Sequence, residues 1–376
     1  MYGGPLERTP QPLFKARLRS VPGINLGRPR VTGKRELSVL NVYLFRKTAG
    51  LQCSIRETRH GVFLLISILY CPASANDRSW KRQQGRRMAK QPKTDKSRNF
   101  HFISGLPRSG STLMGALLRQ NPRFHAGMSS PVASLMEGII AQVSAGTELS
   151  SMVNEEQRAA IIRGLFDTYY RDCKEDVIFD TNRAWTAQLP ALMKLFPDAK
   201  LICTVRNVAW VMDSLERQYR GNMFENTRLF NTPAERSTVY TRLEALAGPN
   251  RLVGFAWHAL QEAVWSEFAD RIVIVDYDIF SARPDEVIGL IYKFLGEKPY
   301  EHDFAHVDYD APEFDTQLGV KGLHKVHEKV EPRPRKSILP PELFERYAKL
   351  SFWSGLKGSK VYRIVPQKTE TKAPAN

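Results

Sequence analysis

A short glycine-framed turn holds the residues with the clearest chemical potential. The stretch FISGLPRSGSTLMGALL (102–118) runs from an apolar, strand-like segment through a turn into a helical pattern. Gly105 and Gly110 have the G-x-x-x-x-G spacing of a phosphate-binding loop, and glycine permits both the tight turn and the close approach of a ligand. Such a turn aims backbone N–H groups and the positive end of a helix dipole at one point. The sequence therefore predicts an anion-binding site.

The side chains of this turn indicate which anion it binds. Ser111 stands where a nucleoside-triphosphate enzyme carries the lysine that reaches the β- and γ-phosphates. Arg108 instead offers a planar guanidinium suited to phosphate or sulfate oxygens, and Thr112 adds a hydroxyl near the helix start. The missing lysine disfavours ATP chemistry, although VIFD (177–180) imitates a Walker-B strand and keeps a P-loop kinase as the alternative. The predicted ligand contacts are Pro107, Arg108, Ser109, Gly110, Ser111 and Thr112.

A second anion site is predicted farther along the chain. Arg206 ends the apolar segment AKLICTVR (199–206), and Ser214 follows eight residues later. Eight residues are about 2.2 helical turns, so Ser214 can face the same strand end. Ligands of open α/β sheets bind at that edge. Two anion sites on neighbouring strand–helix turns suggest a nucleotide with phosphates at both ends.

Strand and helix patterns alternate from residue 99 onward, as βαβ units require. This rhythm predicts a P-loop-like, three-layer α/β fold with a central parallel sheet flanked by helices. Segment 298–340 loses periodicity and is expected to be a long ordered loop or lid. Predicted strands are 99–104, 123–127, 176–180, 199–206 and 271–278, and predicted helices are 111–120, 131–143, 155–172, 186–196, 207–220, 252–269, 284–296 and 341–353.

The net charge of +16 is confined to the N-terminal quarter. Residues 1–98 contain 21 of the 55 Lys/Arg and 5 of the 39 Asp/Glu residues, so the remainder has 34 of each sign and is neutral. A basic field therefore gives no reason to expect a nucleic-acid partner for the globular part. The composition of 1–98 indicates a disordered or non-native extension, and a biological start at Met88 is a further hypothesis.

The apolar run Val62–Cys71 is the strongest membrane candidate in the extension. It spans about half of the ~20 residues that a membrane helix needs, so no stable membrane span is predicted, with an anchor or signal segment as the alternative. The catalytic domain is expected over 99–353 and a flexible tail over 354–376. Cys53, Cys71, Cys173 and Cys203 form no C-x-x-C pair, which indicates free thiols and a cytoplasmic location.

Two motifs together resemble a known enzyme family. GLPRSGSTL followed by VRNVAWVMDSL is similar to the sulfotransferases that use 3′-phosphoadenosine 5′-phosphosulfate (PAPS), especially tyrosylprotein sulfotransferases and their bacterial relatives. The resemblance covers roughly residues 99–350 and extends to VDYD with Tyr277. It implies sulfuryl transfer from PAPS, without a metal, to a hydroxyl of a protein tyrosine, a glycan or a small molecule. The oligomeric state stays open, with a homodimer as one candidate.

The resemblance also implies residue roles. Arg108 and the N–H groups of Gly110 to Thr112 would hold the donor's 5′-phosphate, and Arg108 would stabilise charge on the leaving phosphate. Arg206 and Ser214 would hold the 3′-phosphate, while Tyr277 would line the adenosine site.

The chain departs from the family pattern at the general base. Met128 and Ser129 stand where the tyrosylprotein branch has a glutamate. Nearby candidates for the base are His125, Asp180 and Glu137, although Asp180 fits equally well as a strand-end cap. Arg183 is interpreted either as a cation aimed at the transferring group or as a structural residue.

Further departures concern the 3′-phosphate site and metals. Ala209 replaces the usual second arginine, for which Arg217 is a substitute. The stretch GLHKVHEKVEPRPRK (322–336) is predicted to close over the 3′-phosphate, with a solvated charged loop as the alternative. Its candidate contacts are Lys325, Arg333 and Arg335. His302 and His306 have i, i+4 spacing but lack a third patterned ligand, so no metal site is predicted.

Overall fold

The computed structural model describes residues 40–46, 49–58, 61–67, 98–144, 146–224, 229–318 and 324–366. It divides into two compact units, 1–93 and 94–376. The larger unit carries all the predicted site residues.

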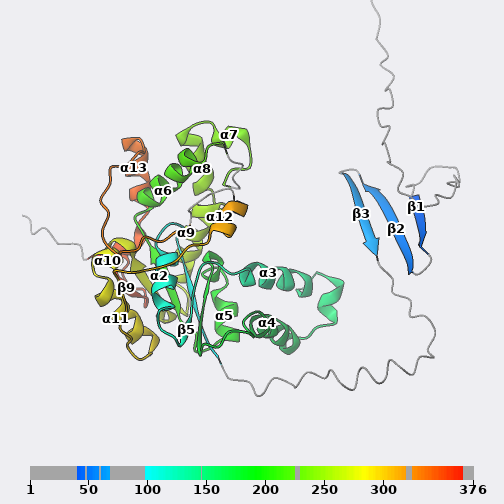
Figure 1. Cartoon of the computed structure of the whole chain (residues 1–376), viewed down its shortest axis with the longest axis horizontal. Coiled ribbons are helices and arrows are strands. Elements are labelled where there is room, and N and C mark those ends of the chain that lie inside the picture. The colour runs from blue at the N-terminus through cyan, green and yellow to red at the C-terminus, as the bar shows by residue number, and fades with distance from the viewer. Residues whose placement is uncertain are drawn as a thin grey trace, which may run out of the picture. The chain divides into compact units, whose positions relative to one another are not determined.

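The core of the larger unit is a six-stranded parallel sheet (Figure 1). Its strand order is β5-β6-β4-β7-β8-β9. The inner strands β6, β7 and β8 are buried along their whole length, and so is β4 after its first residue, as expected for a sheet covered on both faces. The predicted α/β fold is therefore confirmed. The strands are β4 (Asn99–Gly105), β5 (Phe124–His125), β6 (Val177–Thr181), β7 (Leu201–Val205), β8 (Ile272–Asp276) and β9 (Tyr362–Ile364).

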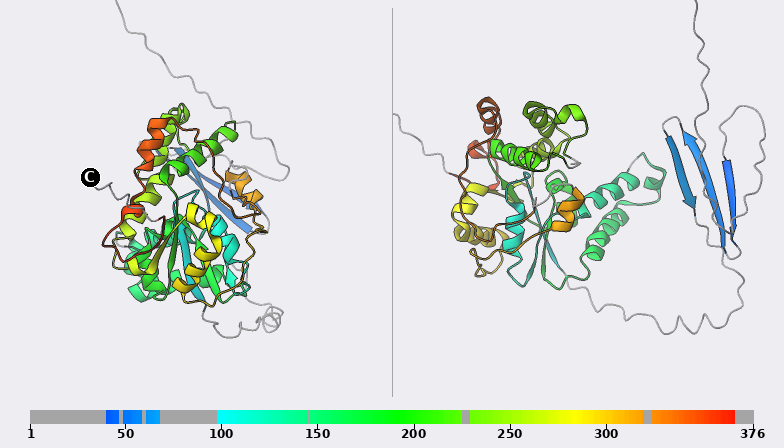
Figure 2. Two further views of the ribbon diagram at one scale, coloured as in Figure 1. Left: turned by 90° about the vertical axis from the view of Figure 1, so that its left-hand side faces the viewer. Right: turned by 45° about the horizontal axis from the view of Figure 1, so that its top comes forward.

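Helices pack on both faces of this sheet (Figure 2). One face packs against α2 and α11, whose Leu117 and Ile291 are fully buried. The other face packs against the apolar sides of α3, α4, α5, α6 and α9. The helices are α2 (Ser111–Leu118), α3 (Val132–Val143), α4 (Glu155–Tyr169), α5 (Leu189–Leu195), α6 (Val208–Gly221), α7 (Pro233–Arg236), α8 (Val239–Ala247), α9 (Leu252–Ala263), α10 (Tyr277–Ala282), α11 (Pro284–Leu295), α12 (Pro312–Leu318) and α13 (Pro341–Ala348).

Most predicted elements are present, but β8 ends earlier than expected. The strand was predicted to continue through residue 278, whereas Tyr277 is already the first residue of α10. The Asp276 carboxylate accepts a hydrogen bond from the Asp278 N–H at 2.9 Å and thereby caps the new helix. Helices α7, α8 and α12 were not predicted.

The expectation of a flexible tail from Ser354 is wrong for its first part. Tyr362–Ile364 form the edge strand β9, paired in parallel with β8. Val361 is buried, and the Tyr362 ring packs against Phe294 of α11 at 5.0 Å between centroids. These contacts hold the strand in place. Residues 367–376 lie outside the described part of the chain.

The smaller unit contains an antiparallel sheet that the sequence analysis did not predict. Its strands are β1 (Leu40–Arg46), β2 (Ala49–Thr58) and β3 (Gly61–Ser67), with β2 in the middle. The apolar run from Val62 thus begins as a strand and continues beyond the described residues. The remainder of the predicted extension, including Met88, lies outside them as well.

No helix in the described ranges combines the length and the apolar content needed to cross a bilayer.

Candidate active site

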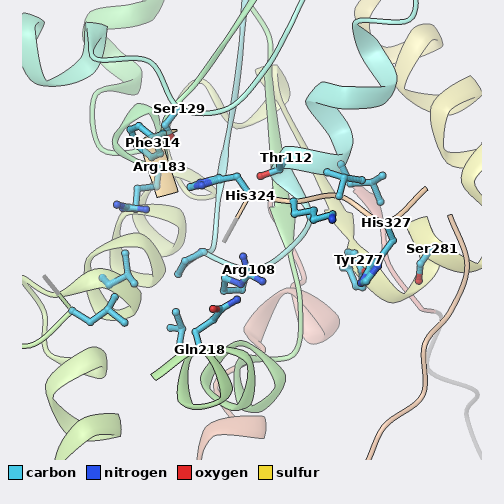
Figure 3. A pocket seen from close by; sticks show the side chains of 18 of the residues that line it. Arg108, Thr112, Ser129, Arg183, Gln218, Tyr277, Ser281, Phe314, His324 and His327 are labelled. Carbon is cyan, nitrogen blue, oxygen red and sulfur yellow. The ribbon is translucent and has the colours of Figure 1, made fainter. Parts of the chain in front are cut away.

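A cavity of about 780 Å³ opens where several parallel strands end (Figure 3). Its wall combines residues that follow β4, β6 and β8 with residues of α6, the start of α9 and the late segment 314–335. This is the edge at which the sequence analysis placed both anion sites. Lining residues used below are Arg108, Gly110, Thr112, Ser129, Asn182, Arg183, Gln218, Asn250, Phe255, Tyr277, Phe314, His324, Lys325, His327, Arg333 and Arg335.

The turn between β4 and α2 has the backbone geometry that its glycines predict. Gly105 and Gly110 have φ values of 108° and 95°. A Cβ atom on Gly105 would lie 2.1 Å from the Thr204 carbonyl oxygen, and one on Gly110 would lie 2.6 Å from Cδ2 of Tyr277. Both positions therefore require glycine. Arg108 also has a positive φ, 59°, which is unusual for a side-chain-bearing residue and typical of functional turns.

Ser109 supports this turn instead of facing the cavity. Its side chain is fully buried, and its hydroxyl lies 2.8 Å from the Thr204 carbonyl and 2.9 Å from the Thr204 hydroxyl. It also donates to the Leu106 carbonyl. Ser109 was predicted as a ligand contact, but it does not line the cavity and its side chain anchors the turn to β7.

The remaining turn residues differ in their access to the cavity. Pro107, Gly110 and Thr112 line it, whereas Ser111, the first residue of α2, does not. The ligand contact of Ser111 stays a prediction.

The two predicted anion sites meet in this structure. Nε of Arg108 donates to the Ser214 hydroxyl at 3.2 Å, and Ser214 is buried on α6. Burial, followed by the nearby Arg335 cation, lowers the pKa of Arg108. Sequence spacing brought both residues to the same strand edge, but it did not predict that they touch.

Arg206 lies near this pair, although neither Arg206 nor Ser214 is among the residues that line the cavity. Its guanidinium packs on the Tyr277 ring at 4.5 Å and forms a 3.4 Å ion pair with Asp278. Its Nε is buried and has no hydrogen-bond partner within the described residues. Tyr277 thus sits against both Gly110 and Arg206, which joins the first turn to the second. An unsatisfied buried guanidinium N–H is the kind of group that an anionic ligand completes.

Asp213 ties the late segment to α6. Its buried carboxylate accepts hydrogen bonds or ion pairs at 2.9 Å from both Arg217 and Arg335, and a 2.8 Å hydrogen bond from the Ile338 N–H. Arg217 does not line the cavity, so its predicted role as a substitute 3′-phosphate ligand is not supported. Lys325, Arg333 and Arg335 do line it.

Asp180 is not placed to act as the general base. Its carboxylate is fully buried and accepts hydrogen bonds from the Tyr170 hydroxyl (2.6 Å), the Ser130 hydroxyl (2.7 Å) and the Trp185 indole (2.9 Å). Burial raises the pKa of Asp180, but the residue does not line the cavity. A base must reach the proton it removes. The prediction of a catalytic Asp180 is corrected to a structural role, the alternative left open by the sequence.

The other predicted bases also point elsewhere. His125 packs against Tyr170, has a pKa lowered mainly by burial, and is absent from the cavity wall. Glu137 is exposed on α3 and is absent from it too. Ser129, at the position where a carboxylate was expected, does line the cavity but cannot act as that carboxylate.

A histidine–aspartate pair in the cavity wall was missed by the sequence analysis. Nδ1 of His324 lies 2.5 Å from Oδ1 of Asp315, and the His324 N–H donates to Oδ2 at 2.9 Å. Asp315 is fully buried on α12, while His324 lines the cavity. Two bonds to one carboxylate fix both the backbone and the ring of His324. The nine-residue separation of Asp315 and His324 matches no local motif. The only related signal in the sequence was the expectation that 298–340 forms an ordered loop or lid.

Arg183 also extends toward the cavity from the segment that follows β6 (Figure 3). Its guanidinium has no hydrogen bond or ion pair among the described residues, and desolvation lowers its pKa. This agrees better with a ligand-facing cation than with a structural arginine. Figure 3 shows Arg108, Thr112, Arg183 and His324 around one hollow.

His302 and His306 do not form a joint site. The His302 ring is buried against the Tyr292 hydroxyl at 3.0 Å, whereas the exposed His306 pairs with Asp303 at 2.9 Å.

Comparison with known proteins identifies the family. Residues 101–302, more than half of the chain, match the model of the sulfotransferase family. The chain belongs to the sulfotransferase family, as its two motifs predicted. This membership counts against the kinase alternative.

Individual relatives are distant. Nodulation protein NoeE of Sinorhizobium fredii is 28% identical over 225 residues, which are 55% of this chain and 52% of that protein. The chain thus matches about half the length of this curated relative. Among solved structures, the sulfotransferase domain of the Synechococcus PCC 7002 olefin synthase has 17% identity and a TM-score of 0.41, covering 69% of this chain and 96% of that one. Mouse sulfotransferase SULT7A1 complexed with PAP has 15% identity and a TM-score of 0.40, covering 70% and 87%.

Proposed function

We propose that this chain transfers a sulfuryl group from PAPS to an acceptor hydroxyl. The observation that carries the proposal is the arrangement of three groups at one edge of the sheet. The lysine-free anion turn around Arg108 and the His324–Asp315 pair reach the cavity wall, and Arg206, whose buried Nε has no hydrogen-bond partner among the described residues, packs on the lining residue Tyr277.

The residues that line the cavity and those directly behind its wall suit a doubly phosphorylated adenosine. Gly110, the N-cap of α2, and Thr112 in its first turn line the cavity, and backbone N–H groups at a helix start suit a phosphate. Arg206 offers its buried Nε, and Ser214 supplies a hydroxyl that Arg108 now contacts. When bound, PAPS supplies the activated sulfuryl group. Gly110, Thr112 and Arg108 would hold its 5′ end, Arg206 and Ser214 its 3′ end, and Tyr277 its adenosine.

His324 is the proposed general base. With Nδ1 bound to Asp315, Nε2 is the ring nitrogen left to accept a proton from the acceptor hydroxyl. Asp315 acts as a positioning residue that fixes the ring and stabilises the cation formed. Arg108 holds negative charge developing on the leaving phosphate, and Arg183 is proposed to neutralise the transferring group.

The acceptor is proposed to be polar and hydroxyl-bearing. The cavity wall also includes the amide side chains of Asn182, Gln218 and Asn250 and the rings of Phe255 and Phe314. Amides can bond hydroxyl groups while rings cover apolar faces. A glycan, a protein tyrosine and a small hydroxyl compound all remain acceptors to be screened with labelled donor. A cytoplasmic location and a homodimer likewise stay predictions.

Donor binding tests the proposal directly. We expect calorimetry to show binding of adenosine 3′,5′-bisphosphate without Mg²⁺, and labelled PAPS to transfer sulfate to an acceptor panel. Turnover of Mg-ATP with no bisphosphate binding would contradict the proposal and restore the kinase alternative.

A further inference from the structure

Three side chains with metal-binding atoms meet outside the cavity. They are His125 at the end of β5 and Cys173 and Glu175 in the loop between α4 and β6. The ring nitrogen, the sulfur and a carboxylate oxygen all lie within 4.8 Å of one another, and each residue is partly buried. None of them lines the proposed catalytic cavity.

The distance between two of these atoms fits tetrahedral zinc. His125 Nδ1 and Cys173 Sγ are 3.5 Å apart. Zinc bonds of about 2.0–2.1 Å to nitrogen and about 2.3 Å to sulfur, at a tetrahedral angle, place the two ligand atoms about 3.5 Å apart. A thiol–imidazole hydrogen bond explains this pair alone. It leaves unexplained why the Glu175 carboxylate, which has no hydrogen bond or ion pair among the described residues, joins the group.

The backbone holds the three residues in place without a metal. The Arg123 carbonyl accepts hydrogen bonds from the N–H groups of Asp176 (3.0 Å) and Val177 (3.1 Å), which locks β5 to the end of the loop. Arg98 donates to the Cys173 carbonyl at 3.1 Å, which fixes the start of the loop. The His125 ring also packs edge-on against Tyr170. A preorganised set of ligands loses little conformational entropy on binding.

We propose that His125, Cys173 and Glu175 bind one Zn²⁺ ion, with water as the fourth ligand. One thiolate, one carboxylate and one neutral imidazole balance the two positive charges of zinc, and mixed N, S and O donors suit that ion. The site is structural. It cross-links the two-residue edge strand β5 to the α4–β6 loop, next to the segment that brings Ser129 to the cavity. This proposal departs from the expectation, drawn from the sequence, that the chain has no metal site.

Metal titration of the full chain tests this site. After treatment with EDTA and its removal, we expect one Zn²⁺ per chain by elemental analysis and a rise in melting temperature on adding zinc. Co²⁺ should give the thiolate-to-metal charge-transfer absorption of a cysteine ligand. Cys173→Ala and His125→Gln should weaken binding by at least about tenfold, since even the loss of an outer partner costs 10–100-fold.

Matched variants separate this site from incidental binding. Cys203→Ala removes the buried thiol of β7, and His306→Gln removes an exposed histidine, so both should bind zinc like the wild type. If Cys173→Ala fails to fold, Glu175→Gln at a partly exposed position provides the same test. Absence of stoichiometric binding, or binding that survives both Cys173→Ala and His125→Gln, would overturn the proposal. Neither outcome bears on PAPS binding.

Discussion

The β4–α2 turn and the late segment 314–335 reach the same cavity by different means. The turn is short, and its shape follows from Gly105, Gly110 and the bonds that Ser109 makes to β7. The late segment is held by two buried carboxylates. Asp315 binds the His324 ring, and Asp213 of α6 forms an ion pair with Arg335. Backbone geometry therefore shapes the proposed anion-binding side of the cavity, and side-chain charges shape the side with the proposed base. Substitutions in the two regions should consequently have different signatures.

The largest effect is expected for Arg108→Ala. Loss of this guanidinium would remove both the proposed phosphate contact and the proposed charge stabilisation, so labelled sulfate transfer should fall by about 10³-fold. Arg346→Ala, a surface arginine on α13 whose ion-pair distance is 3.5 Å, is the control and should leave transfer unchanged. Near-normal turnover of Arg108→Ala would refute the role assigned to the turn.

His324→Gln should lower kcat by about 10²-fold, the lower range for a general base, with little change in donor affinity. His327→Gln is a matched control because His327 also lines the cavity but has no buried carboxylate partner among the described residues. Asp315→Asn should reduce kcat and alter the pH profile, since the amide cannot stabilise a charged ring. Equal losses in the His324 and His327 variants would show that the late segment contributes no specific base.

Arg206→Ala should weaken bisphosphate binding by about 10–100-fold, the range for hydrogen bonds to charged groups. Its effect on kcat at saturating donor should be small because Arg206 is proposed to bind the phosphate remote from the transferred group. Calorimetry measures the first quantity and steady-state kinetics the second. Arg217→Ala, whose parent side chain pairs with Asp213 outside the cavity wall, should leave donor affinity within about twofold of the wild type. If Arg217→Ala weakened bisphosphate binding more than Arg206→Ala, the 3′-phosphate would have to bind at a different site.

The smallest effect is expected for Gly110→Ala, which tests how far the stability of the turn depends on the backbone conformation of this glycine. Its left-handed conformation costs a side-chain-bearing residue about 1–2 kcal/mol, and the new Cβ also meets Tyr277 at 2.6 Å. Gly296→Ala shares the positive φ but has open space around it, so the difference between the two variants in thermal unfolding measures the contact alone. Equal destabilisation would mean that Tyr277 moves aside freely.

Local spacing in the sequence was enough to place several candidate site residues at one edge of the sheet. The glycines of the turn, Arg206 and Ser214 all follow individual strands at short intervals, so their common edge could be inferred from the parallel-sheet rule. Asp180 was misassigned because a strand-end carboxylate looks the same whether it faces a cavity or the core. Its burial under Tyr170, Ser130 and Trp185 comes from tertiary packing. His324 was missed because its partner Asp315 lies on α12 and His324 lies beyond the end of that helix. No sequence-spacing rule predicts a contact between two such residues.

The edge strand β9 has a practical consequence for protein production. Tyr362–Ile364 satisfy the outward-facing hydrogen-bonding groups of β8, whose Asp276 directly precedes the cavity-lining Tyr277. A recombinant chain truncated after Trp353 would leave that sheet border open to pairing with other molecules and would favour aggregation. Expression should therefore extend at least through Pro366.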